Sequence, residues 1–174
     1  MMYSIRPLGP EDAEVYHALR LRMLREHPEA FTSSFEEASS KPLAWAEARL
    51  TPATGAPEKF VLGAFAGDDE LIGSVGMAVE ERLKERHKGF VFGMFVAPEA
   101  GAAGVGRALL ADCIARARRV PGLELLTLTV TSSNLRALQF YQAAGFRAFG
   151  IEQRAIKVAG IHYPKAHMMF DLLA

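Results

Sequence analysis

The sequence has little of several things, and each scarcity excludes a class of protein. Its 174 residues include one cysteine, which excludes an intramolecular disulfide and a cysteine-rich zinc site. Lysine and arginine together number 20, as do aspartate and glutamate, so no cationic excess favours a general nucleic-acid or membrane-surface binder. No run approaches the roughly 18 apolar residues that cross a bilayer, and the first six residues hold no apolar signal core. We therefore expect a soluble, cytoplasmic protein with no metal, nucleic-acid or membrane partner.

What the sequence does have is ordinary globular composition, with 50% apolar and 23% charged residues. A chain of this length buries about 70% of the surface that its unfolded form exposes, which is enough for a stable core. It contains no internal repeat, low-complexity tract or interdomain linker. We expect a single domain over residues 1–174.

The first half of the chain is expected to hold two helices and then a hairpin of strands. Val15, Leu19 and Met23 recur every fourth residue and form one apolar helical stripe. Residues 31–40 are polar and are expected to be irregular, and 51–57 is rich in residues that break regular structure. The expected elements are a strand at 3–6, helices at 10–26 and 42–50, and strands at 60–66 and 71–80, joined by a turn at 67–70.

The second half alternates strands with helices. Residues 90–96 form a nearly unbroken apolar run, as expected for a strand buried on both faces. Such alternation predicts a partly parallel sheet, so we expect a mixed α/β sheet with helices on both faces. The expected elements are strands at 90–96 and 123–130, helices at 104–119 and 134–144, and last strands at 146–149 and 163–172.

The stretch from Ala97 to Arg107 has the composition of an anion site. Gly101, Gly104 and Gly106 would let a ligand approach the backbone closely. The helix start that follows exposes unpaired N–H groups and carries partial positive charge, which favours phosphate or pyrophosphate. The alternative is a tight turn whose glycines serve packing. The spacing matches neither the P-loop nor the dinucleotide-binding motif.

A second stretch places polar groups along one helical stripe. Asn134, Leu138 and Tyr141 are spaced i, i+4 and i+7, so the two polar side chains lie about 10 Å apart along the axis. The alternative makes Asn134 a plain helix cap and Tyr141 a half-buried aromatic residue.

Taken together, these motifs resemble those of the GCN5-related N-acetyltransferase (GNAT) family. The resemblance is strong over residues 71–149 and implies a mixed, mostly antiparallel central sheet, with a splayed parallel strand pair and helices on both faces. It also implies that acetyl-CoA is the acyl donor. The motifs are Val96-Ala97-Pro98-Glu99, Gly104-Val105-Gly106-Arg107-Ala108-Leu109-Leu110, and Asn134-x-x-Ala137-x-x-Phe140-Tyr141-x-x-x-Gly145-Phe146.

The resemblance also implies roles for single residues. The pantetheine arm would enter between the strand ending at Val96 and the strand 125–130, and the pyrophosphate would lie at 101–107. Asn134 would bond the arm, and Tyr141 would lie beside the thioester sulfur as the catalytic residue. The implied cofactor-binding residues are Met94, Phe95, Val96, Gly101, Ala102, Ala103, Gly104, Val105, Gly106, Arg107, Asn134 and Tyr141.

The loop departs from the family pattern at its first positions. Gly101 stands where the family usually has Gln or Arg, and Ala102-Ala103 follow where glycine or a basic residue is often found. A hydrogen bond to a charged group contributes roughly 1.5–3 kcal/mol. We therefore expect weaker CoA binding, with backbone N–H groups and Arg107 remaining.

The expected reaction is direct attack of a primary amine, favoured as a small molecule, on the thioester. The N–H of Val96 would polarise the carbonyl and Tyr141 would protonate the thiolate. The general base stays open among water and the candidates Glu36, Glu37, Glu80, Glu81, His87 and Glu152.

Two other functions compete with this one. They are a non-catalytic acyl-CoA-binding regulatory module and an α/β interaction domain without a cofactor. Homodimers are frequent in the family, so a second copy of the chain is a candidate partner.

Overall fold

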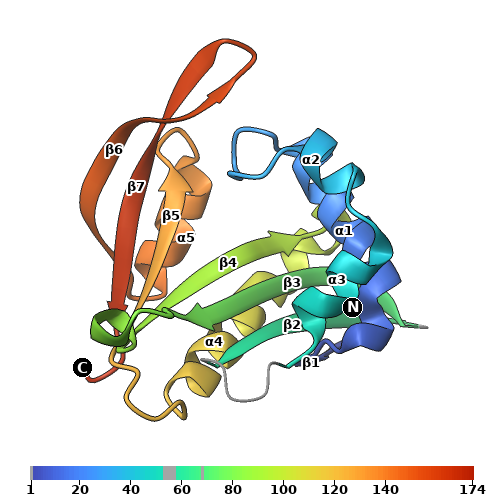
Figure 1. Ribbon diagram of the computed structural model, residues 1–174, viewed down its shortest axis with the longest axis horizontal. Coiled ribbons are helices and arrows are strands. Elements are labelled where there is room, and N and C mark those ends of the chain that lie inside the picture. Colours follow the sequence, from blue (N-terminus) through green and yellow to red (C-terminus); the bar gives the residue numbers. More distant parts are fainter. Residues whose placement is uncertain (1, 53–57, 68) are drawn as a thin grey trace.

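The computed structural model describes residues 2–52, 58–67 and 69–174, and its centre is a seven-stranded sheet (Figure 1). The strand order across the sheet is β1-β2-β3-β4-β5-β7-β6. The strands are β1 (Tyr3–Pro7), β2 (Lys59–Ala66), β3 (Glu70–Val79), β4 (Lys88–Val96), β5 (Leu125–Thr131), β6 (Arg147–Val158) and β7 (Ile161–Asp171). The helices are α1 (Ala13–Glu26), α2 (Phe35–Ser39), α3 (Leu43–Leu50), α4 (Val105–Ala117) and α5 (Leu135–Ala143), with 3₁₀ turns η1 (Pro10–Asp12), η2 (Leu83–Glu85) and η3 (Pro98–Ala103).

Only one pair of neighbouring strands in this sheet is parallel. β4 and β5 run in the same direction, whereas the other five pairs are antiparallel. The parallel pair is held at Lys88–Leu125, Gly89–Leu126 and Phe90–Thr127, and beyond these partners the two strands diverge (Figure 1). The mixed, mostly antiparallel sheet with a splayed parallel pair is confirmed.

A bulge in β4 accompanies the divergence. Phe92 pairs with Gly76 and Phe95 with Ser74, so β4 holds one residue more than β3 over this stretch. Gly93 has φ +60°, a conformation that side chains with a Cβ rarely adopt, and its carbonyl accepts a hydrogen bond of 3.1 Å from Ser74 Oγ. A bulge bends its strand, which here turns the end of β4 away from β5.

The expectation that 90–96 is buried on both faces is wrong. Phe90 is 37% exposed, and only Val91 and Phe95 are buried. A parallel strand is covered when both its edges and both its faces are occupied. The splay removes the neighbour from one edge of β4 past Phe90, and the side chains of Phe90, Phe92 and Met94 border an open cavity instead of a covering element.

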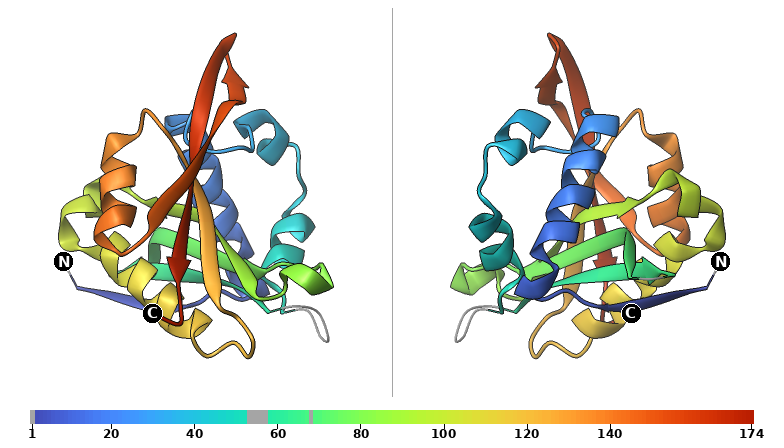
Figure 2. Two further views of the ribbon diagram at one scale, coloured as in Figure 1. Left: turned by 90° about the vertical axis from the view of Figure 1, so that its left-hand side faces the viewer. Right: turned by 90° about the vertical axis from the view of Figure 1, so that its right-hand side faces the viewer.

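Helices cover both faces of the sheet and make two separate cores (Figure 2). α1 and α3 pack on one face around Tyr16, Leu24 and Phe95. α4 packs on the other face with Leu109, Leu110 and Cys113 fully buried, and α5 joins it through Tyr141. Cys113 is a buried packing residue, and burial raises the pKa of its thiol to about 12.

Two elements are longer or more regular than the sequence predicted. α2 lies in the stretch expected to be irregular, and a capping box begins it: Glu37 N donates to Ser34 Oγ at 3.1 Å, and Ser34 N donates to Glu37 Oε2 at 3.0 Å. β6 reaches Val158, nine residues past the expected end at Phe149, and projects with β7 beyond the sheet (Figure 2). Its residues are mostly exposed, so no buried apolar run marked it as a strand. Of the loop and the turn expected before and after β2, residues 53–57 and 68 lie outside the described residues.

Candidate active site

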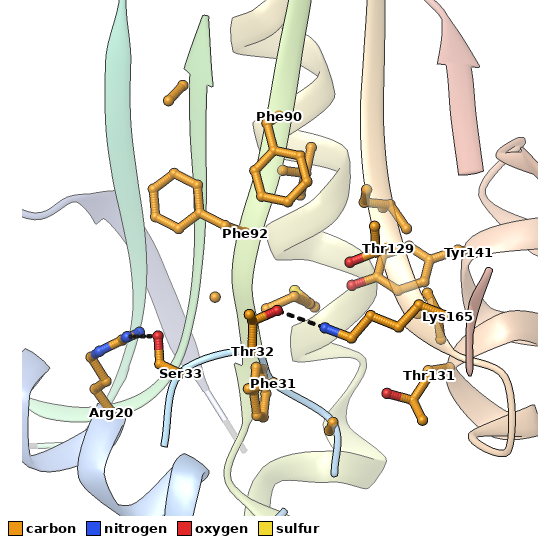
Figure 3. A pocket seen from close by; sticks show the side chains of 18 of the residues that line it. Arg20, Phe31, Thr32, Ser33, Phe90, Phe92, Thr129, Thr131, Tyr141 and Lys165 are labelled. Carbon is orange, nitrogen blue, oxygen red and sulfur yellow. Dashed lines mark hydrogen bonds between the residues drawn. The ribbon is translucent and has the colours of Figure 1, made fainter. Parts of the chain in front are cut away.

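A cavity of about 570 Å³ lies where β4 and β5 separate (Figure 3). One wall is β4 from Phe90 to Met94, and the other is β5 from Leu128 to Thr131. α5 contributes Tyr141 and the cap residue that precedes the helix, and the segment 30–33 between α1 and α2 contributes to the same lining. The unpaired strand edges give this cavity main-chain donors and acceptors that regular sheet pairing would consume.

Asn134 and Tyr141 both line this cavity, as their helical spacing predicted. Asn134 also caps α5, since its Oδ1 accepts a hydrogen bond of 3.0 Å from Ala137 N. The cap interpretation is therefore confirmed, but it occupies only the oxygen and leaves the side-chain amide protons for a ligand.

The ring of Tyr141 is fixed by aromatic neighbours. Its centroid lies 5.1 Å from that of Phe140 and 5.7 Å from that of Phe146, both edge to face. The residue is 8% exposed, and burial raises the pKa of its phenol above the ordinary value. The phenol therefore stays protonated at neutral pH and is suited to donate a proton rather than to accept one.

The glycine-rich segment stands outside the cavity lining, at the exposed start of α4. Gly104 has φ +77°, and a Cβ built on it would meet nothing within 4 Å, so the surface above it is open. No side chain caps α4, and the first turn of any α-helix leaves N–H groups without helical partners. The geometry suits an anion placed over this helix start.

Gly106 serves packing as well. A Cβ on Gly106 would lie 3.3 Å from Met94 Cε and 3.4 Å from Val96 Cγ2, so its absence lets α4 approach β4 closely. The packing alternative thus applies to Gly106, whereas at Gly104 the backbone conformation itself requires glycine.

Two arginines outside this segment lie beside it, and neither was predicted from the sequence. A Cβ on Gly101 would lie 3.9 Å from Nη2 of Arg136, which brings a guanidinium from α5 beside the loop that lacks its own cation. Arg22 of α1 donates to both carboxylate oxygens of Glu99, at 2.6 and 2.8 Å, and lowers the pKa of Glu99 to about 2. Arg22 therefore holds η3 in place and compensates the one carboxylate of the segment 97–107.

The other residues expected to bind the cofactor are divided between cavity and surface. Met94 lines the cavity. The side chain of Phe95 is buried on the opposite face among α1 and α3, so only its backbone is available to a ligand in the splay. The segment residues are mostly exposed: Gly101, Ala102, Gly104 and Arg107 are exposed, Ala103 and Gly106 are half-buried, and Val105 is buried.

None of the six candidates for the general base lines the cavity. Glu37 is held by the capping box, which lowers the pKa of its carboxyl. Glu152 Oε2 lies 3.0 Å from His167 Nε2 on the β6–β7 hairpin. Glu80 follows β3 at the paired end of β4, where its N–H donates to the carbonyl of Lys88. The described lining of the cavity contains no carboxylate and no imidazole.

The cavity instead contains cations that sequence reasoning missed. Arg20, Arg49, Lys59 and Lys165 all line it, from α1, α3, β2 and β7 respectively. They are separated by up to 145 positions and share no motif, so only the folded chain brings them together. Aromatic side chains complete this part of the lining, namely Phe31, Trp45, Phe90 and Phe92.

No group of three or more His, Cys, Asp or Glu side chains among the described residues is arranged to hold a metal ion. No helix among those residues is long and apolar enough to span a membrane.

Comparison with known proteins gives a family model and many similar folds. Residues 5–169 match the model described as "Acetyltransferase (GNAT) domain". No curated protein matches the chain. A GNAT-family acetyltransferase structure from Streptococcus pneumoniae is 23% identical, with 98% of this chain and 99% of that chain covered and a TM-score of 0.79.

Two other solved structures are named for their acceptors. A putative phosphinothricin N-acetyltransferase is 17% identical, covers 98% of this chain and 99% of its own, and has a TM-score of 0.80. A spermidine N-acetyltransferase chimera that includes Vibrio cholerae sequence is 17% identical, covers 99% and 97%, and has a TM-score of 0.75. At such identities these likenesses concern the fold alone.

Proposed function

The chain belongs to the GNAT acetyltransferase family, and from that premise we propose that it transfers the acetyl group of acetyl-CoA to the primary amine of a small molecule. The family uses acetyl-CoA as its co-substrate. The observation that carries the proposal is the unpaired opening between β4 and β5, with Asn134 and Tyr141 on one wall. We propose residues 1–174 as one acetyltransferase domain.

Acetyl-CoA would bind along the opening and across the start of α4. Main-chain groups of Met94, Phe95 and Val96 face the pantetheine arm, and the amide protons of Asn134 bond to it from the other wall. The pyrophosphate lies over the N–H groups that follow Gly104, with Arg107 and Arg136 as its cations. The described residues fit this ligand because both the strand edges and the helix start offer open donors.

The reaction forms a C–N bond and breaks a C–S bond. The amine attacks the thioester carbonyl, whose oxygen is polarised by the N–H of Val96. The departing thiolate takes the proton of Tyr141, and the phenol is reprotonated through water from the acetylated nitrogen. Since no carboxylate or imidazole lines the described cavity, the amine binds in its neutral form or gives its first proton to water. The alternative, a non-catalytic acyl-CoA-binding module, has no need of a phenol at this place.

The first test is binding of the donor. Acetyl-CoA at one hundred times its dissociation constant should stabilise the fold by about 2.7 kcal/mol, measured as a rise in melting temperature. S-acetylpantetheine, which lacks the phosphates, is the control and should stabilise less at equal concentration. A panel of primary amines then tests transfer by release of free thiol. No melting shift at millimolar acetyl-CoA would contradict the proposal, whereas a shift without thiol release for any amine would favour the binding module.

Arg136 provides a test of the phosphate site. Replacing Arg136 by Gln removes a guanidinium beside Gly101 and should weaken CoA binding by about 10- to 150-fold, the equivalent of one hydrogen bond to a charged group. The measurement is titration calorimetry with CoA at low and high salt, where the difference between variants should shrink as salt rises. Arg119→Gln, which removes an exposed arginine after the far end of α4, is the matched control and should bind as the parent does. Equal affinity of both variants would remove Arg136 from the site.

A further inference from the structure

We infer that the acceptor carries an oxyanion, such as the carboxylate of an amino acid, on the same molecule as its amine, and that Arg20 and Lys165, which flank the Thr32-Ser33 segment, make the part of the cavity that receives it. The inference rests on the proposed acetyl transfer and names the class of acceptor. It begins from the charge of the cavity. Four cationic side chains line it, and no aspartate or glutamate does so among the described residues, in a chain whose formal net charge is zero.

Lys165 is a buried charge that forms no ion pair with a carboxylate among the described residues. It is 5% exposed, and its Nζ donates a hydrogen bond of 2.7 Å to Thr32 Oγ1. Among the described residues no carboxylate oxygen lies within 4.0 Å of it. Glu152 is its cross-strand partner on β6, and this carboxylate, which contacts His167, only partly offsets the effect of burial on the pKa of Lys165. A neutral hydroxyl does not balance a buried ammonium group, and burial lowers the pKa of Lys165.

Arg20 shows the same shortage on the other side of the cavity. Its Nη2 donates to Ser33 Oγ at 2.9 Å, and its buried Nε has no partner within the described chain. The guanidinium carbon lies 5.4 Å from the centroid of the Trp45 ring, which holds the group toward the cavity. An arginine whose buried Nε–H has no partner, and that forms no ion pair with a carboxylate among the described residues, is arranged to receive an oxyanion.

One short segment stands between the two cations. Thr32 and Ser33 are adjacent, and their hydroxyls accept from Lys165 and Arg20 respectively (Figure 3). Hydrogen bonds to a charged acceptor are roughly twice as strong as those to a neutral one, so a bound oxyanion would displace these hydroxyls.

The remaining cations strengthen the positive field. Arg49 donates to Tyr16 Oη at 3.0 Å and stacks on Phe92 with 4.6 Å to the ring centroid. The pKa of Lys59 is lowered, mainly by burial and to a smaller extent by the nearby charge of Arg49. Such a positive field repels a polyamine. It also lowers the pKa of the acceptor's ammonium group, so that more of the acceptor is the neutral amine although no carboxylate base lines the cavity among the described residues.

The test compares acceptors that differ only in the oxyanion. L-methionine, L-methioninamide and 3-(methylthio)propylamine form one series, and L-phenylalanine, its amide and phenethylamine form another, within a panel of all L-amino acids. Spermidine is the polycationic probe. Rates are expressed per neutral amine, because the amine pKa differs along each series. We expect kcat/KM for the carboxylate to exceed that of the amide and of the simple amine by about 10- to 150-fold, the effect of a hydrogen-bonded charge.

Single substitutions test whether Arg20 and Lys165 cause the preference for carboxylate acceptors over amides. Lys165→Gln and Arg20→Gln should each bring the ratio of carboxylate to amide toward one, while the melting shift given by acetyl-CoA stays as in the parent. Lys84→Gln removes an exposed cation outside the cavity and should keep the ratio. The ratio is internal to each variant, so a partial loss of folded protein does not change it.

A second measurement needs no turnover. 2-Hydroxy-4-(methylthio)butanoate and 3-phenyllactate, which lack the amine, should bind the CoA-loaded protein in calorimetry and should bind Lys165→Gln and Arg20→Gln more weakly. If they bind so while no amine releases thiol, the oxyanion site stands and acetyl transfer fails. If thiol is released but amides or spermidine match the carboxylates, or if both variants keep the preference, the inference is overturned. It is also overturned if the amine-free carboxylates do not bind and the amino acids are not acetylated faster than their amides.

Discussion

Tyr141→Phe should lower turnover by about 10²- to 10⁴-fold, the usual contribution of a general acid, and should leave acetyl-CoA affinity nearly unchanged. The substitution removes one oxygen and keeps the ring between Phe140 and Phe146, so the core around it is preserved. The departing thiol has a pKa near 8.5 and leaves fairly well by itself, which is why the loss is not larger. The assay follows release of free thiol under saturating acetyl-CoA and amine.

The raised pKa of Tyr141 adds a pH dependence to this expectation. An acid acts only while it is protonated, and a raised pKa keeps the phenol protonated as pH rises past its ordinary value near 10. The parent should therefore show no fall in turnover between pH 7 and 10. Tyr163→Phe, at a phenol on β7 outside the cavity, is the control and should behave as the parent. Undiminished turnover in Tyr141→Phe, with chemistry limiting the rate, would end the acid role.

Gly104→Val should lower the affinity for CoA by about 100-fold, because the valine side chain would obstruct two or more hydrogen bonds from the start of α4 to a charged phosphate. A Cβ at this position meets no protein atom within 4 Å, so it would occupy the open surface where the phosphate is placed. The positive φ adds a cost in stability of roughly 1–2 kcal/mol for a residue with a Cβ. Calorimetry with CoA measures the first effect and thermal unfolding the second.

A second glycine separates the two effects. Gly122 has φ +76° and open space around a Cβ, as Gly104 does with φ +77°, but it lies in the turn before β5. Gly122→Val should therefore lose similar stability and keep its CoA affinity. If both variants bind CoA as the parent does, the phosphate does not lie at this helix start.

The sequence by itself determined most of the helices and strands, and it placed Asn134 and Tyr141 on one side of a helix. Local apolar periodicity is enough to place α1, because burial of one helical stripe depends on residues a turn or two apart. The spacing from Asn134 to Tyr141 fixes that both face one side of α5, whatever packs against it. The left-handed conformation at Gly145, φ +101°, likewise follows from the residue type at a helix end.

Only the tertiary structure decided the acceptor side and the extent of the last hairpin. Lys165 donates a hydrogen bond to Thr32, which lies 133 positions earlier in the chain. The two residues are close because β5–β7 pairing puts Lys165 opposite Thr131, at the end of the sheet that the segment after α1 crosses. β6 is a strand because β7 pairs with it, not because its own exposed side chains favour burial. Helical spacing is a property of neighbours in the chain, whereas the charge of a cavity depends on strand register and on which loops cover it. The four cations that line the cavity could therefore not be grouped before the fold was known.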